Sequence, residues 1–295
     1  MTVTAIPTRR DNNMAPAVGA RPRKARFNPY LLLLLAWIVG VLGPYAWTFI
    51  TSITPSQDLA SKGLTLWPAE PTLEAYGALL TQTPFLTYMR NSLAVAAGTV
   101  LLTISLSLLA GTALSRYRFR GRQAVLFGVL LVQLFPAVLL VVPLYSELRT
   151  LGLLDSTLGL ILVHTTFALP FSTWLMKGFI DQIPVELEEA AFMDGATRFT
   201  SFFHVILPLS RSGIAAAGTY AFIYSWNEFI YALTFTTSEA SRTMPVGLRQ
   251  FIGENTIRWD FLTAGGILAA VPIIIGFMFA QRSLVEGMTA GAVKG

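Results

Sequence analysis

The chain has 295 residues, of which 54% are hydrophobic and 13% are charged, with a formal net charge of +5 and no cysteine. Because soluble domains carry about a quarter charged residues, this composition excludes an ordinary water-soluble globular protein. The lack of cysteine also excludes disulfides, thiol nucleophiles and cysteine-based metal sites.

Residues 1–29 form a basic segment, which we expect to be a mostly disordered cytoplasmic tail. No apolar core adjoins its early arginines, so it does not resemble a cleaved signal peptide. Residues 30–295 then form a single transmembrane domain. This domain should include an ordered cytoplasmic loop at about residues 181–211, which is polar although it lies between two long apolar runs.

Six apolar segments are long enough to cross about 30 Å of hydrocarbon. Backbone groups in lipid must be hydrogen-bonded internally, so each segment should be a helix. The runs do not alternate as the strands of a transmembrane barrel do. We therefore predict an all-α polytopic membrane protein with six transmembrane helices. The predicted spans are Tyr30–Ile53, Asn91–Leu114, Ala124–Tyr145, Thr157–Phe179, Gly213–Phe235 and Thr263–Gln281.

The positions of lysine and arginine predict the orientation of these spans. Fifteen of the 21 basic residues lie in the two terminal segments, in the loops after the second and fourth predicted spans, or, in the case of Lys177, at the end of the fourth span. Both termini and the 181–211 loop are therefore expected in the cytoplasm. The basic residues then mark orientation and contact with anionic lipid, and no nucleic-acid partner is expected.

Three segments should lie on the opposite side of the membrane, at residues 54–90, 146–156 and 236–262. In the first of them, Pro71 and Thr72-Leu73-Glu74 predict a turn that leads into a short amphipathic helix. Four prolines inside the predicted spans should kink them. These are Pro136, Pro143, Pro170 and Pro272.

The 181–211 loop has the pattern of a helix–turn–helix hairpin. Good helix formers run from Pro184 to Met193, with acidic residues early, where they suit the positive end of the helix dipole. Asp194-Gly195 supplies a break, because glycine tolerates the left-handed conformation that ends a helix. A second helix is expected from about Thr197 to Ile206, with Pro208 at the return to the membrane.

The residues Glu189-Ala190-Ala191-Phe192-Met193-Asp194-Gly195 and Val205-Ile206-Leu207-Pro208 carry a resemblance to a known family. They resemble the EAA loop of the permease subunits of bacterial ATP-binding-cassette importers, and only Val205, where isoleucine is usual, departs slightly. The resemblance implies that this loop docks onto an ATPase. A bland amphipathic connector would explain the acids but not the placement of the alanines and the glycine. The implied docking and coupling residues are Glu189, Ala190, Ala191, Asp194, Gly195, Leu207 and Pro208.

The residue types of the loop also suit a contact with a partner. Ala190 and Ala191 permit a close backbone approach, and Glu189 offers a carboxylate for an arginine or a backbone donor. The chain contains no G-x-x-x-x-G-K-[ST] motif. We therefore expect a transporter subunit that is not an enzyme and binds no cofactor, with ATP and Mg used by a partner ATPase.

Further motifs resemble those of carbohydrate importers of the maltose type, over roughly residues 65–295. They lie at residues 71–76, 91–93, 226–229 and 281–295. This resemblance implies an inner-membrane complex with a second homologous permease subunit, an ATPase dimer and an extracytoplasmic sugar-binding protein. The implied cargo is maltose or maltodextrin. It also implies that residues 236–262 reach toward the binding protein and that residues 290–295 contact the ATPase.

Polar and aromatic residues in the fifth predicted span offer the chemistry of a sugar path: Trp226, Asn227, Glu228 and Tyr231. Ionisable residues within a membrane are functional candidates by default. However, the favoured alternative is that Asn227 and Glu228 lock this helix to a neighbour through hydrogen bonds. For His164, helix packing is favoured over a proton relay, because no partner acid lies nearby in the sequence.

Other interpretations of the sequence remain open. An ion-coupled secondary transporter would need no ATPase, but no internal repeat is visible. A membrane-embedded enzyme would need acids or histidines gathered at one depth, and no such set is evident. The same importer mechanism could also serve trehalose, another oligosaccharide or glycerol phosphate.

Overall fold

The computed structural model describes residues 29–61, 66–254 and 256–292, and these residues are mainly helical. The chain divides into two compact units, residues 1–44 and 45–295. The first unit contains most of α1 (Pro29–Ser52), whose leucine-rich surface is exposed. Residues 1–28, where a disordered tail is expected, lie outside the described residues.

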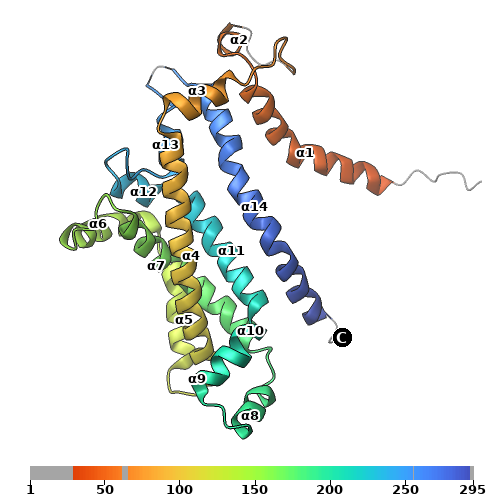
Figure 1. Ribbon diagram of the computed structural model, residues 1–295, viewed down its shortest axis with the longest axis vertical. Helices are drawn as coiled ribbons and strands as arrows, with labels where there is room; N and C mark the ends of the chain where they lie inside the picture. The colour runs from red at the N-terminus through yellow and green to blue at the C-terminus, as the bar shows by residue number, and fades with distance from the viewer. Residues whose placement is uncertain (1–28, 62–65, 255, 293–295) are drawn as a thin grey trace, which may run out of the picture. The chain divides into compact units, whose positions relative to one another are not determined.

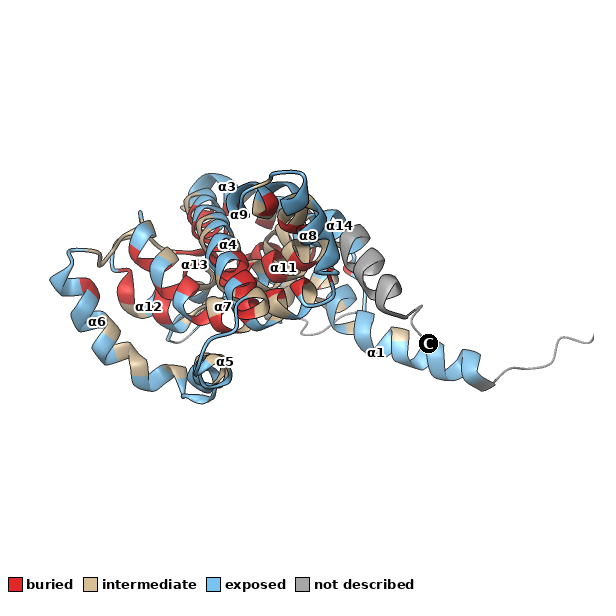
Figure 2. Cartoon of the chain, turned by 90° about the horizontal axis from the view of Figure 1, so that it is seen from below, coloured by how far each residue is buried: buried red, intermediate tan, exposed pale blue. Residues whose placement is uncertain are grey.

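The second unit is built around three helices, α4 (Phe85–Arg116), α7 (Thr157–Ile180) and α11 (Arg211–Asn227). α14 (Trp259–Ala292) packs along α11 (Figure 1). Figure 2 shows the buried residues on α4, α7 and α11 where these helices face one another, whereas α5 and α6 are mostly exposed. An outer surface rich in exposed apolar side chains is the arrangement that a bilayer solvates.

Small residues allow these helices to approach closely. A Cβ atom on Gly111 of α4 would lie 3.0 Å from the backbone nitrogen of Lys177, and one on Gly213 of α11 would lie 2.8 Å from the Cβ of Phe179. Lys177 and Phe179 both belong to the last turns of α7. Glycine and other small residues at such contacts are typical of helix packing in membranes, where tight van der Waals contact replaces the hydrophobic driving force.

Four of the predicted spans correspond to continuous helices. Among the described residues, four helices are long and apolar enough to cross a membrane, and a fifth span results if one bent pair is counted. α4 and α14 begin before the predicted spans, at Phe85 and Trp259. α7 and α14 continue through Pro170 and Pro272. The all-α polytopic prediction is thus supported, and the number of spans stays a prediction.

The third predicted span is bent. α5 (Arg122–Leu131) continues through the short helix η1 (Val132–Leu134), and after Pro136 the chain resumes in η2 (Ala137–Leu140) and α6 (Val141–Thr150). The two parts meet at 95°. Proline has no N–H to donate and disfavours helical geometry at the residue before it. Pro136 therefore breaks the helix, as predicted, whereas Pro143 sits in the first turn of α6, where proline is tolerated.

The fifth predicted span is divided as well. α11 ends at Asn227, Glu228 is extended, and α12 (Ile230–Phe235) begins after Phe229. The continuous helix expected over residues 213–235 is therefore corrected to a broken one. Neither glycine nor proline marks this break. The acidic side chain of Glu228 stabilises it instead, because it accepts hydrogen bonds from the first free N–H groups of α12.

The end of the bundle that carries α3 (Glu74–Gln82) is held by polar contacts. The amide of Asn91 in α4 donates to the carbonyl oxygens of Ala240 and Arg242, at 2.7 and 2.9 Å. The hydroxyl of Ser92 accepts from the backbone nitrogen of Met244 at 2.7 Å, where α13 (Met244–Arg249) begins. α2 (Ser56–Ser61) lies at the same end (Figure 1). The amphipathic helix predicted after Pro71 is confirmed as α3.

Asp155 ties the connection between α6 and α7 to the segment after α12. It is the one described non-glycine residue with a positive φ, at 56°. Its carboxylate accepts from the backbone nitrogens of Thr237 and Ser238, at 2.7 and 3.0 Å, and from the hydroxyl of Ser241. Burial raises the pKa of this carboxyl, but the hydrogen bonds from these residues outweigh burial, so the pKa lies well below its usual range.

We predict that Gly111→Leu destabilises the protein by about 1–3 kcal/mol, because the added side chain meets backbone of α7 that cannot rotate away. Gly128→Leu in α5 is the matched control, since a Cβ there meets nothing within 4 Å. Thermal unfolding in detergent measures both. Equal melting temperatures for the two variants would contradict the close α4–α7 contact.

We predict that Asp155→Ala lowers stability near neutral pH, and that the difference from the wild type shrinks in acid. Because the folded-state pKa is lowered, the carboxylate stabilises the protein fully above pH of about 5 and loses this effect as pH falls through the folded-state pKa. Denaturant unfolding at several pH values measures the difference. Glu147→Ala in exposed α6 is the control, and a gap between wild type and Asp155→Ala that does not depend on pH would contradict the argument.

Candidate functional site

A helix–turn–helix hairpin connects α7 to α11. α8 (Glu186–Met193) starts two residues after the predicted Pro184 and has three glutamates in its first turn. Asp194 ends it, and Gly195 has the left-handed φ of 86° that was expected for the break. The amide of Gly195 donates to the carbonyl of Phe192 at 3.0 Å, and that of Ala196 to the carbonyl of Ala191 at 2.9 Å. These bonds satisfy the last carbonyls of α8.

The second arm is less regular than the sequence predicts. α9 (Arg198–Ser201) is capped by the Thr197 hydroxyl, which accepts from the amide of Thr200 at 3.2 Å. A π-helical turn, η3 (Phe202–Ile206), follows, and then α10 (Leu207–Leu209). Pro208 lies just beyond this turn and cannot donate a backbone hydrogen bond. Single π-turns within helices occur often at functional sites.

The hairpin is attached to the end of α4 by a nearly buried ion pair. The guanidinium of Arg116 donates from Nε to Glu188 Oε1 at 2.5 Å and from Nη2 to the carbonyl oxygen of Ile183 at 2.9 Å. The Arg116 and Glu188 side chains are only 12% and 9% exposed. One residue of α4 thus binds both the start of the hairpin and the inner face of α8.

Two further contacts join the same parts. Ser115 donates to Asp181 at 2.6 Å, and Asp181 also pairs with Lys177 at 2.5 Å. Burial raises the pKa of the Asp181 carboxyl, but hydrogen bonds from Lys177 and Ser115 outweigh it, so the pKa is lowered and the group stays ionised near neutral pH. On the second arm, the guanidinium carbon of Arg198 lies 5.4 Å from the centre of the Tyr117 ring.

The outer surface of the hairpin exposes large apolar side chains. Met193 is 88% exposed and Phe199 is 74% exposed, although both belong to a polar segment. Phe199 and Phe203 have ring centres 4.7 Å apart. We call this surface the hairpin patch. It consists of Leu187, Met193, Phe199 and Phe203. Exposed apolar clusters of this kind mark interaction sites.

The predicted coupling residues occupy two environments. Glu189, Ala190, Asp194 and Gly195 are exposed on the hairpin, and Ala191 is half-buried. Leu207 instead packs against the buried cluster that contains Leu108, Met176, Ile180, Ile206 and Ala217, while Pro208 is exposed. The sequence did not identify Glu188 as the anchoring acid, because its partner Arg116 comes from another helix.

The four predicted substrate-path residues are not gathered on one open surface. Trp226 is buried and stacks on Phe222, with ring centres 5.5 Å apart. Tyr231 is buried, stacks on Phe167 at 4.9 Å and donates to the carbonyl of Ala137 at 2.8 Å. Asn227 is exposed and donates to the carbonyl of Ile223 in its own helix at 2.8 Å. Their role in a sugar path stays a prediction.

Glu228 joins three helices through a buried polar network. Its carboxylate accepts from the amides of Tyr231 and Ala232 at 2.9 and 3.0 Å, and it lies 3.3 Å from Nε2 of His164 in α7. Nδ1 of His164 lies 2.8 Å from the hydroxyl of Ser225, which contacts that of Thr99 in α4 at 3.5 Å. His164 therefore has a partner acid, which sequence distance concealed. These contacts agree with the interpretation that Glu228 holds its helix to neighbouring helices through hydrogen bonds.

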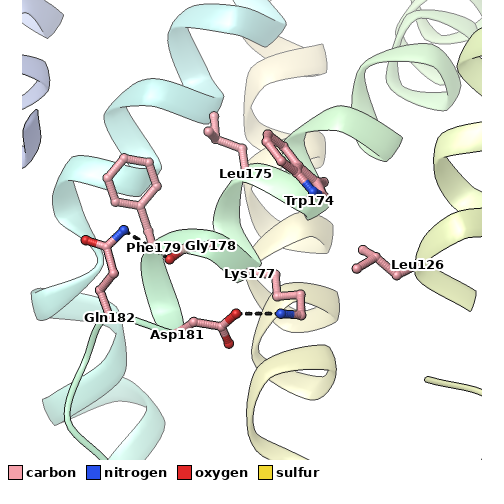
Figure 3. Close-up of a pocket in the computed structure, with 8 residues that line it drawn as sticks. All are labelled: Leu126, Trp174, Leu175, Lys177, Gly178, Phe179, Asp181 and Gln182. Atoms are coloured by element: carbon pink, nitrogen blue, oxygen red, sulfur yellow. Dashed lines mark hydrogen bonds and ion pairs between the residues drawn. The ribbon is translucent and has the colours of Figure 1, made fainter. Parts of the chain in front are cut away.

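A cavity of about 270 Å³ lies beside the end of α7 that leads into the hairpin. Figure 3 shows Trp174 at one side of it and the Lys177–Asp181 ion pair at the other, with Leu126 of α5 opposite. The amide of Gln182 donates to the carbonyl of Gly178 at 3.3 Å. The cavity thus combines an aromatic face with charged and polar groups.

Residues 103–290 match the model of the family described as "Binding-protein-dependent transport system inner membrane component". The chain belongs to this family. It is 38% identical over 258 residues (88% of this chain, 90% of the relative) to the sulfoquinovosyl glycerol transport system permease protein SmoH of Agrobacterium fabrum. It is 35% identical over 260 residues to the diacetylchitobiose uptake system permease protein DasC of Streptomyces coelicolor, which covers 87% of this chain and 93% of DasC.

A third relative and one solved structure also resemble this chain. The trehalose/maltose transport system permease protein MalG of Thermococcus litoralis is 34% identical over 270 residues, 90% of this chain and 96% of MalG. A chain in the crystal structure of a bacterial ABC transporter involved in the import of the acidic polysaccharide alginate has the same fold. Its TM-score is 0.75 at 24% identity, covering 86% of this chain and 94% of that chain.

Membership of this family decides the general role. The protein is an inner-membrane permease subunit of a binding-protein-dependent ABC transporter. It is not an enzyme, and a separate ATPase subunit hydrolyses ATP. The hairpin that the sequence singled out therefore belongs to a protein that depends on another chain for its energy.

We predict that Arg116→Ala loosens the hairpin, because Glu188 is left buried without its partner, at a cost of about 3–5 kcal/mol. Amide hydrogen exchange of residues 183–195 should accelerate at least tenfold. Arg118→Ala, in the exposed loop after α4, is the matched control. A double variant Arg116→Ala/Glu188→Ala should lose less than the sum of the single variants, and full additivity would contradict a direct pair.

Proposed function

We propose that this protein is one permease subunit of an ATP-driven saccharide importer, and that the hairpin docks onto its ATPase. The hairpin patch is the observation that carries the proposal. An apolar surface with Met193 88% exposed and Phe199 74% exposed is costly in water and fits a pocket on a partner. Glu189, Ala190, Ala191, Asp194 and Gly195 lie on the same hairpin and would complete the docking surface.

Motion would pass from the ATPase to the membrane through the base of the hairpin. Arg116 joins α8 to α4, and Leu207 packs the other end of the hairpin into the core at α7 and α11. A force on the patch would therefore move several spans together, because these contacts hold both ends of the hairpin to the spans. Rigid-body movement of this kind is one way that access alternates between the two sides of a membrane.

The proposed complex has further parts. We infer six spans, formed by α1, α4, the bent pair α5–α6, α7, the broken pair α11–α12 and α14, with both termini in the cytoplasm. The placement of basic residues supports this orientation. The partners would be a second homologous permease subunit, an ATPase dimer and an extracytoplasmic sugar-binding protein. A chain of related fold, with a TM-score of 0.65 at 18% identity, occurs in a bacterial alginate ABC transporter in complex with an alginate pentasaccharide-bound periplasmic protein.

A saccharide is the cargo that the relatives support. The names of three of them refer to sulfoquinovosyl glycerol, diacetylchitobiose and trehalose/maltose, all of which contain sugar units. Because these names differ in the sugar, they support the class more than any one member. Maltose, maltodextrin and trehalose are the first cargoes to test, and uptake of labelled sugar by a deletion strain and its complemented parent would identify which is carried.

The docking proposal predicts that Met193→Asp/Phe199→Asp prevents the ATPase from co-purifying with this chain in mild detergent. A buried interface cannot accommodate unpaired carboxylates, so binding should fall at least 100-fold, while the amount of protein in the membrane stays unchanged. Leu151→Asp is the control, because Leu151 is 57% exposed but follows α6, away from the hairpin.

Gly195→Val tests the same docking proposal by changing the backbone conformation of the hairpin turn. Its φ of 86° strains any β-branched residue, so the turn should distort and uptake should be lost while insertion persists. Full ATPase binding and uptake by both the aspartate and the valine variants would contradict the proposal.

A further inference from the structure

A regular stripe of residues runs along one face of α7. His164, Phe167, Phe171 and Trp174 recur every three or four positions, so they lie on the same side of the helix. At 1.5 Å per residue, this stripe extends about 15 Å along the axis. The next turn of the same face leads to the cavity of Figure 3, where Trp174 is a lining residue.

Rings from α11 continue the stripe into an aromatic ladder. The ring centre of Phe171 lies 5.7 Å from that of Trp174 and 4.6 Å from that of Tyr220. Tyr220 lies 6.4 Å from Tyr224, whose ring meets His164 edge-on at 6.3 Å. We define the aromatic ladder as Trp174, Phe171, Tyr220 and Tyr224. It connects the polar network around His164 and Glu228 with the cavity at the end of α7.

The ladder is not sealed inside the bundle. Trp174 is 45% exposed, and Phe171, Tyr220 and Tyr224 are half-buried. Beside it lies Gln133, an exposed polar residue in the middle of an apolar segment, whose amide donates to the carbonyl of Phe167 at 2.9 Å and interacts with the Tyr220 hydroxyl. Polar side chains at membrane depth usually face a bundle interior or a water-filled cavity.

Two simpler explanations fit this surface less well. An aromatic belt at a membrane interface occupies one depth, whereas the stripe on α7 that the ladder follows runs about 15 Å along the helix. A lipid-facing surface consists of apolar side chains without polar groups at their edges, as α14 illustrates with exposed Ile274, Ile275, Phe277, Met278 and Phe279. The ladder instead combines flat rings with hydroxyl and amide groups. Flat apolar faces with a few polar groups at their edges are what a sugar ring, apolar on its C–H faces and polar at its rim, requires.

We propose that the aromatic ladder is a saccharide track, along which the rings of Trp174, Phe171, Tyr220 and Tyr224 contact the faces of a moving sugar. The polar groups along it are the Gln133 amide, the two tyrosine hydroxyls and, at the cavity, Lys177 and Asp181. Several half-exposed rings of similar character avoid one deep binding site, so a sugar can pass from one ring to the next. This proposal rests on the saccharide cargo of the proposed function.

Cysteine accessibility tests the proposal, since the chain has no cysteine of its own. Tyr220→Cys and Trp174→Cys would be made singly in the complete transporter in membrane vesicles and treated with a charged, water-soluble thiol reagent, with and without maltose, trehalose or diacetylchitobiose. Phe279→Cys, at a position 81% exposed on α14, and Phe235→Cys, at a buried position, are the controls. Modification of this chain is measured by mass.

The ladder positions should be modified at least tenfold faster than both controls, and the sugar that the wild type imports should slow their modification. If the wild type imports one of these sugars but the ladder positions are unmodified or unprotected, the track is refuted while the cargo proposal stands. If the wild type imports none of the three, the track proposal falls together with its proposed cargo.

Two variants of Tyr220 distinguish contact between a sugar and the ring face from ordinary side-chain packing. Tyr220→Phe keeps the flat ring, whereas Tyr220→Leu keeps an apolar side chain without it. Uptake at low sugar concentration should be roughly 2- to 10-fold lower in the leucine variant than in the phenylalanine variant, as expected for one lost aromatic contact, because both variants lose the hydroxyl and only the leucine variant loses the ring. Equal uptake by both variants would overturn the role of the ring face.

Discussion

The ion pair between Arg116 and Glu188 is the contact on which the hairpin depends. Arg116 is the last residue of α4, so its side chain reaches beyond the bundle and meets α8 and the carbonyl of Ile183 together. Nearly buried charges are stable only as a pair with good geometry. Separating the hairpin from α4 would therefore leave charge without a partner, which favours movement of hairpin and helix as one body.

Polar side chains also join neighbouring helices at other depths of the bundle. Thr99, Ser225, His164 and Glu228 connect α4, α11 and α7 near the break before α12, and Asp155 binds the segment after α12 at the far end. Apolar packing alone leaves helices free to slide in lipid, because lipid is as apolar as their side chains. These polar contacts fix the helices in register while tight glycine contacts bring them together.

Much of this arrangement can be predicted from the sequence, because long apolar runs and turn residues act locally. The four continuous spans and the turn at Gly195 follow from such signals, as does the break at Pro136. The break at Glu228 does not, since an acid that caps a new helix looks the same in sequence as an acid inside one. The pairs Arg116–Glu188 and His164–Glu228, and the ladder from Trp174 to Tyr224, depend on helices that only the tertiary fold brings together.

The central claim is that the hairpin moves together with α4 when ATP binds to the partner ATPase. Spin labels at Glu186→Cys on α8 and Arg118→Cys beyond α4 would measure it most directly, by pulsed electron paramagnetic resonance in the assembled transporter. The distance between the labels should stay the same with and without ATP, while their distances to a label on the second permease subunit change. A change of several ångströms between α8 and the end of α4 on ATP binding would contradict the account.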